Sequence, residues 1–267
     1  MRCAVIGDPI EHSLSPAIHR MGYQISGLDW AYEPIRVAPG KLREFVASLT
    51  DPGWIGLSVT APHKKNLLEL GEPDSISLMV QGGNTILLGD EPRVYNTDVS
   101  GFVRAWRNRG MSTLSTAVVV GNGATARSLL VALSGLSVRN VTVLARDPAR
   151  AVTLCELGIS LGIDITAQPM DASFRETDLL ASTVPTSATE KWANIWAERA
   201  EVLFDAVYDP WPTPLARAAS PEQPVITGLE LLAGQAVDQF RLLTGCELGF
   251  REALSAAEAE LEARRSS

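Results

Sequence analysis

Lys64 occupies a position in this sequence that suggests chemistry. It follows the apolar run Trp54–Val59, a predicted strand, and lies in the first turn of a helix predicted to begin at Pro62. A cation is unfavourable there, because the N-terminal end of a helix carries positive partial charge. Its presence there therefore indicates a chemical task. The other interpretation is an ordinary surface lysine.

Three further polar residues also follow predicted strands. Asp98 supplies a carboxylate just before the predicted helix Val99–Asn108, and Ser13 and Ser15 follow the predicted strand Arg2–Ile6. Open α/β sheets bind ligands at the carboxyl ends of their strands, so two hydroxyls at a helix N-terminus suit a small carboxylate. Plain helix capping is the alternative role for Asp98 and for Ser15, which precedes a proline.

The glycine-rich stretch 121–126 follows the apolar strand Ala117–Val120 and opens a helix. This is the context of a dinucleotide-binding turn. Gly121 permits the tight turn, Gly123 lets the backbone approach a pyrophosphate, and the small Ala126 allows close helix packing. A plain glycine turn is the alternative interpretation.

The end of the next predicted strand favours NADP over NAD. NAD sites usually place an acidic residue there to bind the ribose 2′-hydroxyl, whereas here Leu144 is followed by Ala145 and Arg146. Arg146 and Arg150 could bind a 2′-phosphate through charge-assisted hydrogen bonds, although Asp147 lies between them. Solvated surface arginines are the alternative.

Composition excludes several classes of protein. The 267 residues carry a net charge of −8, which disfavours binding to nucleic acid or to an anionic membrane. The three cysteines form no C-x-x-C pair, which predicts neither a disulfide framework nor a zinc site and indicates a reducing compartment. The first apolar run is too short for a signal peptide and no stretch is long enough to span a bilayer, so we expect a cytoplasmic protein with a small-molecule substrate and no metal.

Two series of alternating strands and helices are predicted, which implies α/β architecture with parallel βαβ units. The first series adds a strand at 29–37, a helix at 41–49 and a hairpin of 85–88 with 93–95; the second has strands at 117–120, 140–144, 164–168, 179–182, 202–205 and 224–226, with helices at 126–133 and 151–157. Two helices close the chain, one with the apolar stripe Leu229 to Leu243 and one over Arg251–Arg265.

Six motifs in family order resemble those of shikimate and quinate dehydrogenases, and the resemblance spans nearly the whole chain. They are Gly7…Ser13-x-Ser15-Pro16, Ser58-Val59-Thr60-x-Pro62-x-Lys64, Gly83-Asn84-Thr85, Asn96-Thr97-Asp98-x-x-Gly101-Phe102, Asp205-x-x-Tyr208-x-Pro210-x-x-Thr213-Pro214-Leu215 and Gly228…Gln235.

The resemblance implies an NADPH-dependent reduction of 3-dehydroshikimate to shikimate, a step toward chorismate and the aromatic amino acids. It implies an N-terminal α/β substrate domain, residues 1–105 with 232–267 packed back on it, and a Rossmann-type NADP-binding domain, residues 106–231. Lys64 and Asp98 match the catalytic pair. Lys64 would be the general acid/base, because a lysine ammonium can stabilise and protonate the alkoxide that hydride addition to a ketone leaves, with Asp98 keeping Lys64 charged and oriented. The substrate residues carried over are Ser13, Ser15, Thr60, Asn84, Tyr208 and Gln235, and the NADP residues are Gly121, Asn122, Gly123, Ala124, Arg146, Arg150 and Gly228.

Two alternatives stay open within this interpretation. One is a relative that prefers quinate or NAD, and the other is a silent paralogue that binds nucleotide or metabolite for regulation. The chain departs from the family pattern at Ser58, at Ala145 and at residues 182–184, where Asn, Asn and Asn-Ala-Thr are usual. These departures bear on substrate and cofactor preference. The sequence leaves monomer or homodimer undecided.

Overall fold

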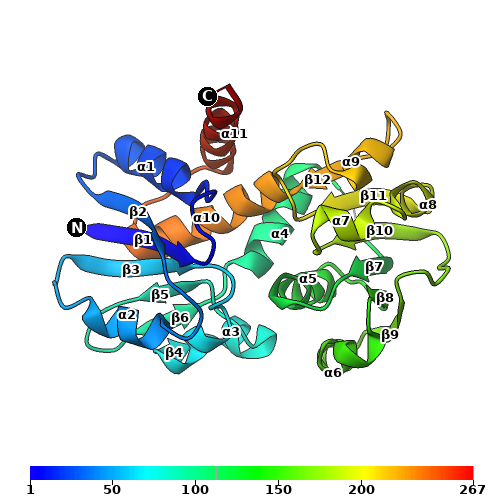
Figure 1. Ribbon diagram of the computed structural model, residues 1–267, viewed down its shortest axis with the longest axis horizontal. Coiled ribbons are helices and arrows are strands. Elements are labelled where there is room, and N and C mark those ends of the chain that lie inside the picture. Colours follow the sequence, from blue (N-terminus) through cyan, green and yellow to red (C-terminus); the bar gives the residue numbers. More distant parts are fainter. Residues whose placement is uncertain (112, 267) are drawn as a thin grey trace. The chain divides into compact units, whose positions relative to one another are not determined.

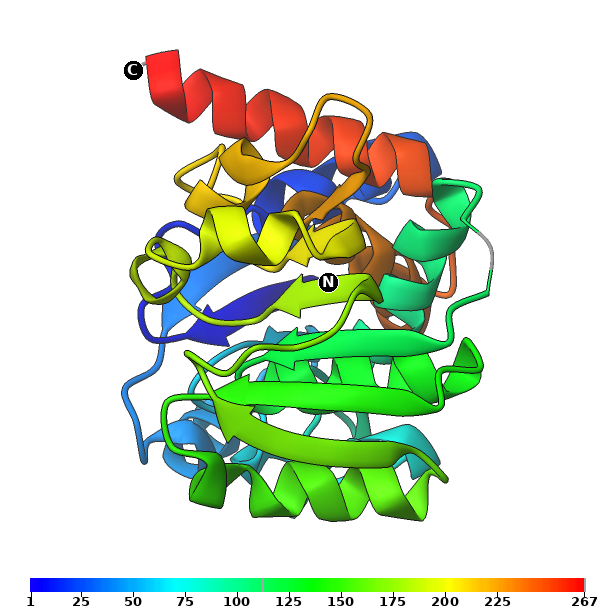
Figure 2. The same ribbon diagram turned by 90° about the vertical axis from the view of Figure 1, so that its right-hand side faces the viewer.

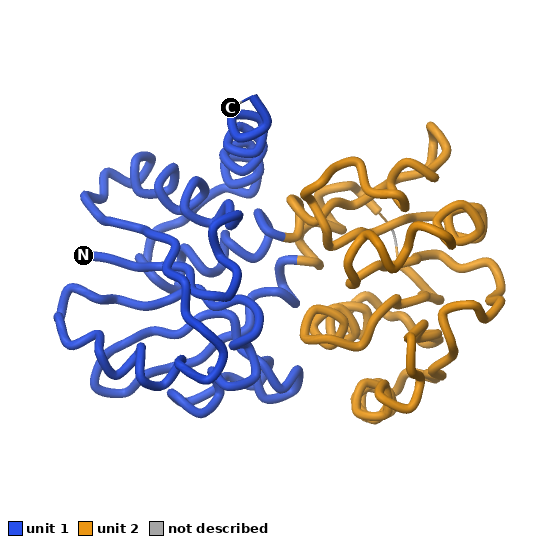
Figure 3. Tube along the Cα trace, in the orientation of Figure 1, with its two compact units in different colours: residues 1–101, 232–267 blue, residues 102–231 orange. Residues whose placement is uncertain are grey.

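The computed structural model describes residues 1–111 and 113–266. The chain forms two compact units, coloured separately in Figure 3: unit 1 comprises Met1–Gly101 and Leu232–Ser267, and unit 2 comprises Phe102–Leu231. The C-terminal segment thus belongs to the same unit as the N-terminus. The boundary lies after Gly101, inside helix α4 (Asp98–Asn108), where the resemblance implied residue 105.

Unit 1 is built on a six-stranded mixed sheet, in the order β2-β1-β3-β5-β6-β4. Its strands are β1 (Arg2–Gly7), β2 (Ala31–Arg36), β3 (Trp54–Val59), β4 (Glu72–Pro73), β5 (Thr85–Leu87) and β6 (Arg93–Tyr95). β1 runs parallel to β2 and β3, whereas β5 is antiparallel to both β3 and β6, which confirms the predicted hairpin. Consequently the start of β5 lies at the same sheet edge as the ends of β1, β3 and β6 (Figure 1).

Helices cover both faces of this sheet, because successive strand residues point to opposite sides. The helices of unit 1 are α1 (Ser15–Ser26), α2 (Leu42–Ser48), α3 (Ser75–Val80), most of α10 (Gly228–Thr244) and α11 (Phe250–Ser266). Ala4 and Ile6 belong to a buried cluster to which Phe45 of α2 adds. On the other face, the ring of Tyr32 stacks on His19 of α1 at 4.2 Å. α11 packs against α1, as Figure 1 shows.

Unit 2 contains a six-stranded sheet in which every pair of neighbours is parallel. Its strands are β7 (Thr116–Val120), β8 (Asn140–Ala145), β9 (Asp164–Pro169), β10 (Thr177–Ser182), β11 (Ala200–Asp205) and β12 (Val225–Thr227), and its further helices are α5 (Ala124–Gly135), α6 (Val152–Ser160), α7 (Thr186–Thr189), α8 (Ala193–Ala197) and α9 (Pro214–Ala218). Figure 2 shows strands of this sheet, green to yellow, lying side by side. The order β9-β8-β7-β10-β11-β12 is that of a dinucleotide-binding Rossmann sheet, with its switch point between β7 and β10.

The helix predicted to begin at Pro62 is wrong. The chain makes turns there and forms only a short 3₁₀ helix, Asn66–Glu69. The physical reason is that the carbonyl of Lys64 accepts a hydrogen bond from Gly83 N at 2.9 Å instead of one from its own segment. Lys64 therefore does not oppose a helix dipole.

Most other predicted elements appear, with ends shifted by a few residues. The short elements α3, β4, α7, α8 and α9 are not predicted from the sequence. In the described part of the chain, no helix has the length and apolar character needed to cross a bilayer.

Candidate active site

Polar residues of unit 1 gather at one edge of its sheet. Thr60 and Lys64 follow β3, Asn84 precedes β5, and Asp98 follows β6. The antiparallel entry of β5 brings Asn84 to the edge where the other two strands end. Gln235 reaches the same cluster from α10.

Lys64 and Asp98 form a partly buried ion pair. Lys64 Nζ donates to Asp98 Oδ2 at 2.6 Å, and the two side chains are 16% and 8% exposed. Such a pair is screened by salt less than an exposed one. The bond from Gly83 N holds the Lys64 backbone beside the start of β5. Hydrogen bonds therefore hold both the backbone and the side chain of Lys64, with its ammonium group on the Asp98 carboxylate.

Helix capping does not explain Asp98. Asn96 Oδ1 accepts the backbone N–H groups of Asp98 at 3.0 Å and Val99 at 3.4 Å, so Asn96 satisfies the first turn of α4. The capping interpretation of Asp98 is wrong, because its carboxylate binds Lys64 through one oxygen and Asn84 Nδ2, at 2.9 Å, through the other.

Asn84 connects this pair to α10. The side chain is buried, and its Oδ1 accepts the backbone N–H of Thr97 at 2.9 Å. Its Nδ2 therefore faces Asp98, with Gln235 Oε1 at 3.4 Å. Gln235 Nε2 donates to Leu232 O at 2.9 Å, which directs its Oε1 toward the cluster. A backbone group thus determines which end of the Asn84 amide meets the carboxylate.

Ser13 lies in the loop between β1 and α1, and Ser15 is the first residue of α1. Leu14 is the N-cap residue of α1 and no side chain caps the helix, so the capping interpretation of Ser15 is wrong. Ser13 Oγ accepts the backbone N–H of Ser15 at 3.3 Å. Across residues 1–111 and 113–266, the hydroxyls of Ser15 and Thr60 have no protein hydrogen-bond partner, which leaves both able to bind a ligand.

In unit 2, the turn between β7 and α5 has the form that an anion site needs. Gly121 adopts φ 107°, and a Cβ on it would lie 2.6 Å from Thr183 Oγ1. α5 begins at Ala124 with Gly123 as N-cap and no side-chain cap, so its first N–H groups stay available. Asn122, Gly123 and Ala124 are exposed. The turn follows β7, at the switch point of the sheet.

Two exposed arginines follow β8. Neither Arg146 nor Arg150 forms an ion pair or side-chain hydrogen bond within the described residues. Asp147, which could have neutralised them, accepts the backbone N–H of Ala149 at 3.1 Å and caps a 3₁₀ helix. The presence of Asp147 between the two arginines therefore has a local structural explanation.

The last two predicted site residues also belong to unit 2, whereas the cluster around Lys64 is built from unit 1 alone. Tyr208 is half-buried in the segment after β11, and Gly228 is the first residue of α10. Asp205 ends β11, and burial raises its pKa to about 6, against hydrogen bonds from Thr213 and from the backbone of Val207.

Sequence reasoning missed several residues that support the cluster. Thr85, Asn96 and Thr97 appear in the family motifs without a role of their own, and Gln239 is not predicted at all. A signal existed, because Gln235 and Gln239 are one helical turn apart and therefore share a face of α10. Their bonds join residues distant in sequence, so no local pattern predicts them.

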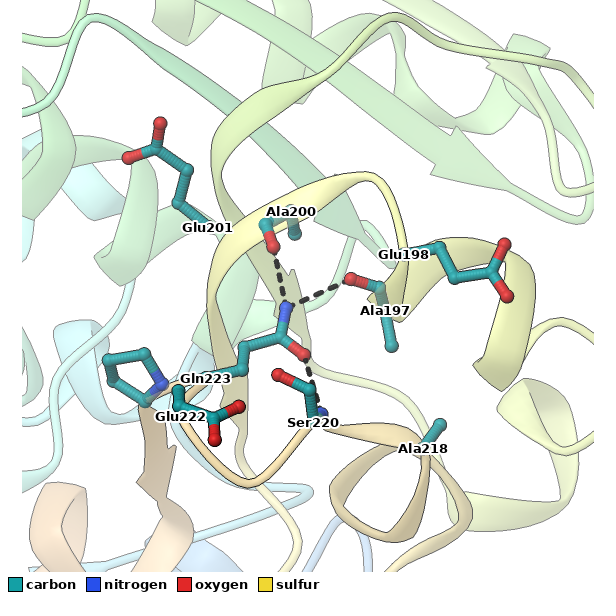
Figure 4. A pocket seen from close by; sticks show the side chains of 9 residues that line it. Ala197, Glu198, Ala200, Glu201, Ala218, Ser220, Glu222 and Gln223 are labelled. Atoms are coloured by element: carbon teal, nitrogen blue, oxygen red, sulfur yellow. Dashed lines mark hydrogen bonds between the residues drawn. The ribbon is translucent and has the colours of Figure 1, made fainter.

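A hollow elsewhere on unit 2 does not compete as a site (Figure 4). It has a volume of about 440 Å³ and is lined by residues around Gln223. Gln223 Nε2 donates to the carbonyls of Ala197, at 2.9 Å, and Ala200, at 2.5 Å, while its Oε1 accepts Ser220 N. The one amide at its centre is therefore used to hold the local backbone.

Known proteins resemble this chain over nearly its full length. Residues 5–86 match the family model described as the shikimate dehydrogenase substrate binding domain. The shikimate dehydrogenase (NADP(+)) of Methanothermobacter thermautotrophicus is 31% identical, over 90% of this chain and 90% of that protein. This chain belongs to the shikimate dehydrogenase family. Within the family, the crystal structure of the Mycobacterium tuberculosis enzyme is 34% identical, with a TM-score of 0.89, covering 97% of this chain and 99% of that one.

A second family structure carries ligands. Shikimate 5-dehydrogenase from Thermus thermophilus, solved in complex with NADP(H) and shikimate, is 28% identical with a TM-score of 0.83, over 97% of this chain and 99% of that one. The predicted combination of a substrate domain with a Rossmann-type domain is therefore confirmed as the fold of this chain.

Proposed function

We propose that this chain catalyses the reversible, NADPH-dependent reduction of 3-dehydroshikimate to shikimate, a step of chorismate and aromatic amino-acid biosynthesis. The observation that carries the proposal is the Lys64–Asp98 ion pair, at 2.6 Å, at the sheet edge of a chain that belongs to the shikimate dehydrogenase family. The names of its relatives supply the substrate and the cofactor.

The substrate residues we propose are Ser13 and Ser15 for the carboxylate and Thr60, Asn84 and Gln235 for the hydroxyls, with Tyr208 lining the site. The hydroxyls of Ser15 and Thr60, which have no hydrogen-bond partner in the described part of the chain, support this assignment. So does Asn84, whose Oδ1 is occupied by Thr97 N. A substrate hydroxyl at Asn84 therefore accepts its hydrogen bond from the amide and donates its own proton elsewhere.

The residues of unit 2 fit NADP. The N–H groups after Gly121 would hold the pyrophosphate, with Asn122, Gly123 and Ala124, and Gly228 would also line the site. Arg146 and Arg150, which have no side-chain partner among residues 1–111 and 113–266, would bind the 2′-phosphate. When bound, the cofactor supplies the hydride for the substrate carbonyl carbon.

Lys64 would act as the general acid. Addition of hydride to a ketone carbon leaves charge on the oxygen, and the Lys64 ammonium both stabilises that charge and donates a proton to it. Asp98 holds Nζ in place through their 2.6 Å hydrogen bond. In shikimate oxidation the same lysine, having lost its proton, takes the proton from the hydroxyl. The ketone thus gains one hydride and one proton, and no metal takes part in these steps.

We place the enzyme in the cytoplasm and assign it a small-molecule substrate. The three cysteines are free thiols, as in proteins of reducing compartments. Monomer and homodimer are both compatible with this proposal.

The test is an absorbance assay of NADPH or NADH formation, with shikimate or quinate as substrate and NADP⁺ or NAD⁺ as cofactor. Shikimate with NADP⁺ should give the highest kcat/KM. Preference for quinate or NAD⁺ would keep the reaction type and overturn the stated specificity. No turnover with any combination, together with measurable nucleotide binding, would favour a regulatory paralogue instead.

A further inference from the structure

A second layer of buried polar side chains lies behind the Lys64 cluster. Gln239, one helical turn beyond Gln235 on α10, is 1% exposed, and Thr85 on β5 is fully buried. Gln239 Nε2 donates to Thr85 Oγ1 at 2.8 Å, and Thr85 Oγ1 lies 3.0 Å from Asn84 Oδ1. A chain of hydrogen bonds therefore runs from α10 through β5 to the amide that meets Asp98.

Two backbone groups, the Asn84 carbonyl and the Thr97 N–H, determine which atom donates and which accepts in these hydrogen bonds. Gln239 Nε2 also donates to the carbonyl of Asn84 at 3.1 Å, which identifies that end of the amide as its nitrogen. The Thr85 hydroxyl accepts from Gln239 and so uses its own proton toward Asn84 Oδ1. Asn84 Oδ1 receives that proton and the one from Thr97 N. With its oxygen saturated, Asn84 presents only its NH₂ group to the cluster.

The opposite end of Gln239 is held equally firmly. Its Oε1 accepts from Ser58 Oγ at 2.6 Å and meets His19 Nε2 at 3.2 Å, and Tyr32 donates to Ser58. Burial lowers the pKa of His19 to about 4, so at neutral pH the imidazole is uncharged and its Nε2 carries the proton. The hydroxyl of Ser58, at one of the departures from the family pattern, is therefore used inside the unit.

We propose that Thr85 and Gln239 are positioning residues for the reaction, acting through Asn84 to hold Asp98 and hence Lys64. The proposal rests on the proposed function. If the Asn84 amide turned over, its oxygen would face the Asp98 carboxylate, and the repulsion would disturb the ion pair. Asn84 Oδ1 accepts hydrogen bonds from two buried donors, the Thr85 hydroxyl and the Thr97 N–H. Rotation of the amide is opposed because it would leave both donors without acceptors. The second layer therefore keeps the cluster in one arrangement before substrate arrives.

The decisive comparison is Thr85→Val against Thr85→Ser. Valine keeps the shape and removes the hydroxyl, whereas serine keeps the hydroxyl. We expect Thr85→Val to lower kcat about tenfold, the effect of losing roughly one hydrogen bond at the reacting groups, with a smaller change in the KM for shikimate. Thr85→Ser should recover most of the loss. Gln239→Met should act in the same direction as Thr85→Val.

Ser77→Ala is the matched control, because Ser77 is a fully buried serine of unit 1 outside this chain of bonds. It should lower thermal stability and leave kcat unchanged. Wild-type kcat in Thr85→Val would overturn the proposal. An equal loss in Thr85→Ser would also overturn it, since packing would then explain the effect.

A measurement without substrate separates this proposal from the proposed function. The chain has seven asparagines, so selective ¹⁵N labelling gives a simple NMR spectrum of side-chain amides, with Asn84 assigned from its loss in Asn84→Asp. Hydrogen exchange of the Asn84 amide should be slow in the wild type and in Thr85→Ser, and at least about tenfold faster in Thr85→Val. Equal exchange rates in all three would overturn positioning even if shikimate is turned over. If shikimate is not turned over, the exchange rates still decide the positioning claim.

Discussion

The two candidate sites are built in opposite ways. In unit 1, the functional side chains are buried or partly buried and bonded to one another, as in the Lys64–Asp98–Asn84 cluster. In unit 2, the candidate cofactor residues are exposed, and Arg146 and Arg150 have no partner within the described chain. A site that transfers protons needs groups held in one geometry before the ligand binds. A site that binds a phosphate needs donors whose capacity is still unused.

Among changes to the two candidate sites, removing Lys64 should have the largest effect on activity. Lys64→Ala should lower kcat about 10³-fold, the usual range for loss of a general acid, while the affinity for NADPH changes little. Lys65→Ala is the control, because the neighbouring lysine is exposed. Steady-state kinetics measure the change in kcat, and a nucleotide titration measures the affinity for NADPH. Similar kcat values for both variants would remove Lys64 from the mechanism.

The buried histidine of unit 1 should make that unit sensitive to acid. His19 has its pKa lowered from 6.5 to about 4, so its contribution to stability is complete above pH 6.5 and is lost as pH falls toward 4. The loss amounts to about 3 kcal/mol. His19→Gln keeps a donor for Gln239 and should abolish this pH dependence. Hydrogen exchange of unit 1 peptides at several pH values measures it, and an unchanged slope in the variant would contradict the assignment.

Unit 2 should respond to pH in the opposite direction through Asp205. Its pKa is raised from 3.8 to about 6, so ionisation costs stability as pH rises through that range, by up to about 3 kcal/mol. Asp205→Asn should therefore gain stability relative to the wild type between pH 4 and pH 7, in hydrogen exchange of unit 2 peptides. A constant difference between the two proteins over that range would show that the carboxyl does not titrate there.

The smallest expected effect comes from the arginines of unit 2. Arg146→Ala with Arg150→Ala should raise the KM for NADPH at least about tenfold, through loss of charge-assisted hydrogen bonds, and leave the KM for NADH unchanged. Arg139→Ala, at another exposed arginine of unit 2, is the control. An equal change with both cofactors would mean that these arginines do not read the 2′-phosphate.

The sequence alone determined much of this protein. The apolar runs predicted β1, β3 and β7 within a residue or two, and the glycine turn after β7 follows from local backbone requirements at Gly121. The resemblance to the family motifs also assigned Lys64 and Asp98 to one catalytic pair without knowledge of the distance between them. These features depend on neighbours within a few positions or on matching one motif at a time.

Only the tertiary structure decided how the polar groups are paired. Locally, Asp98 and Ser15 looked like helix caps and Lys64 like a helix residue; in the fold, Asn96 caps α4, α1 has no side-chain cap, and Lys64 lies in turns. The bonds that matter join residues 34, 14 and 154 positions apart, from Lys64 to Asp98, Asn84 to Asp98 and Gln239 to Thr85. Such partners meet because β5 runs antiparallel to β3 and α10 returns to the first unit, and neither choice is encoded in a short stretch of sequence.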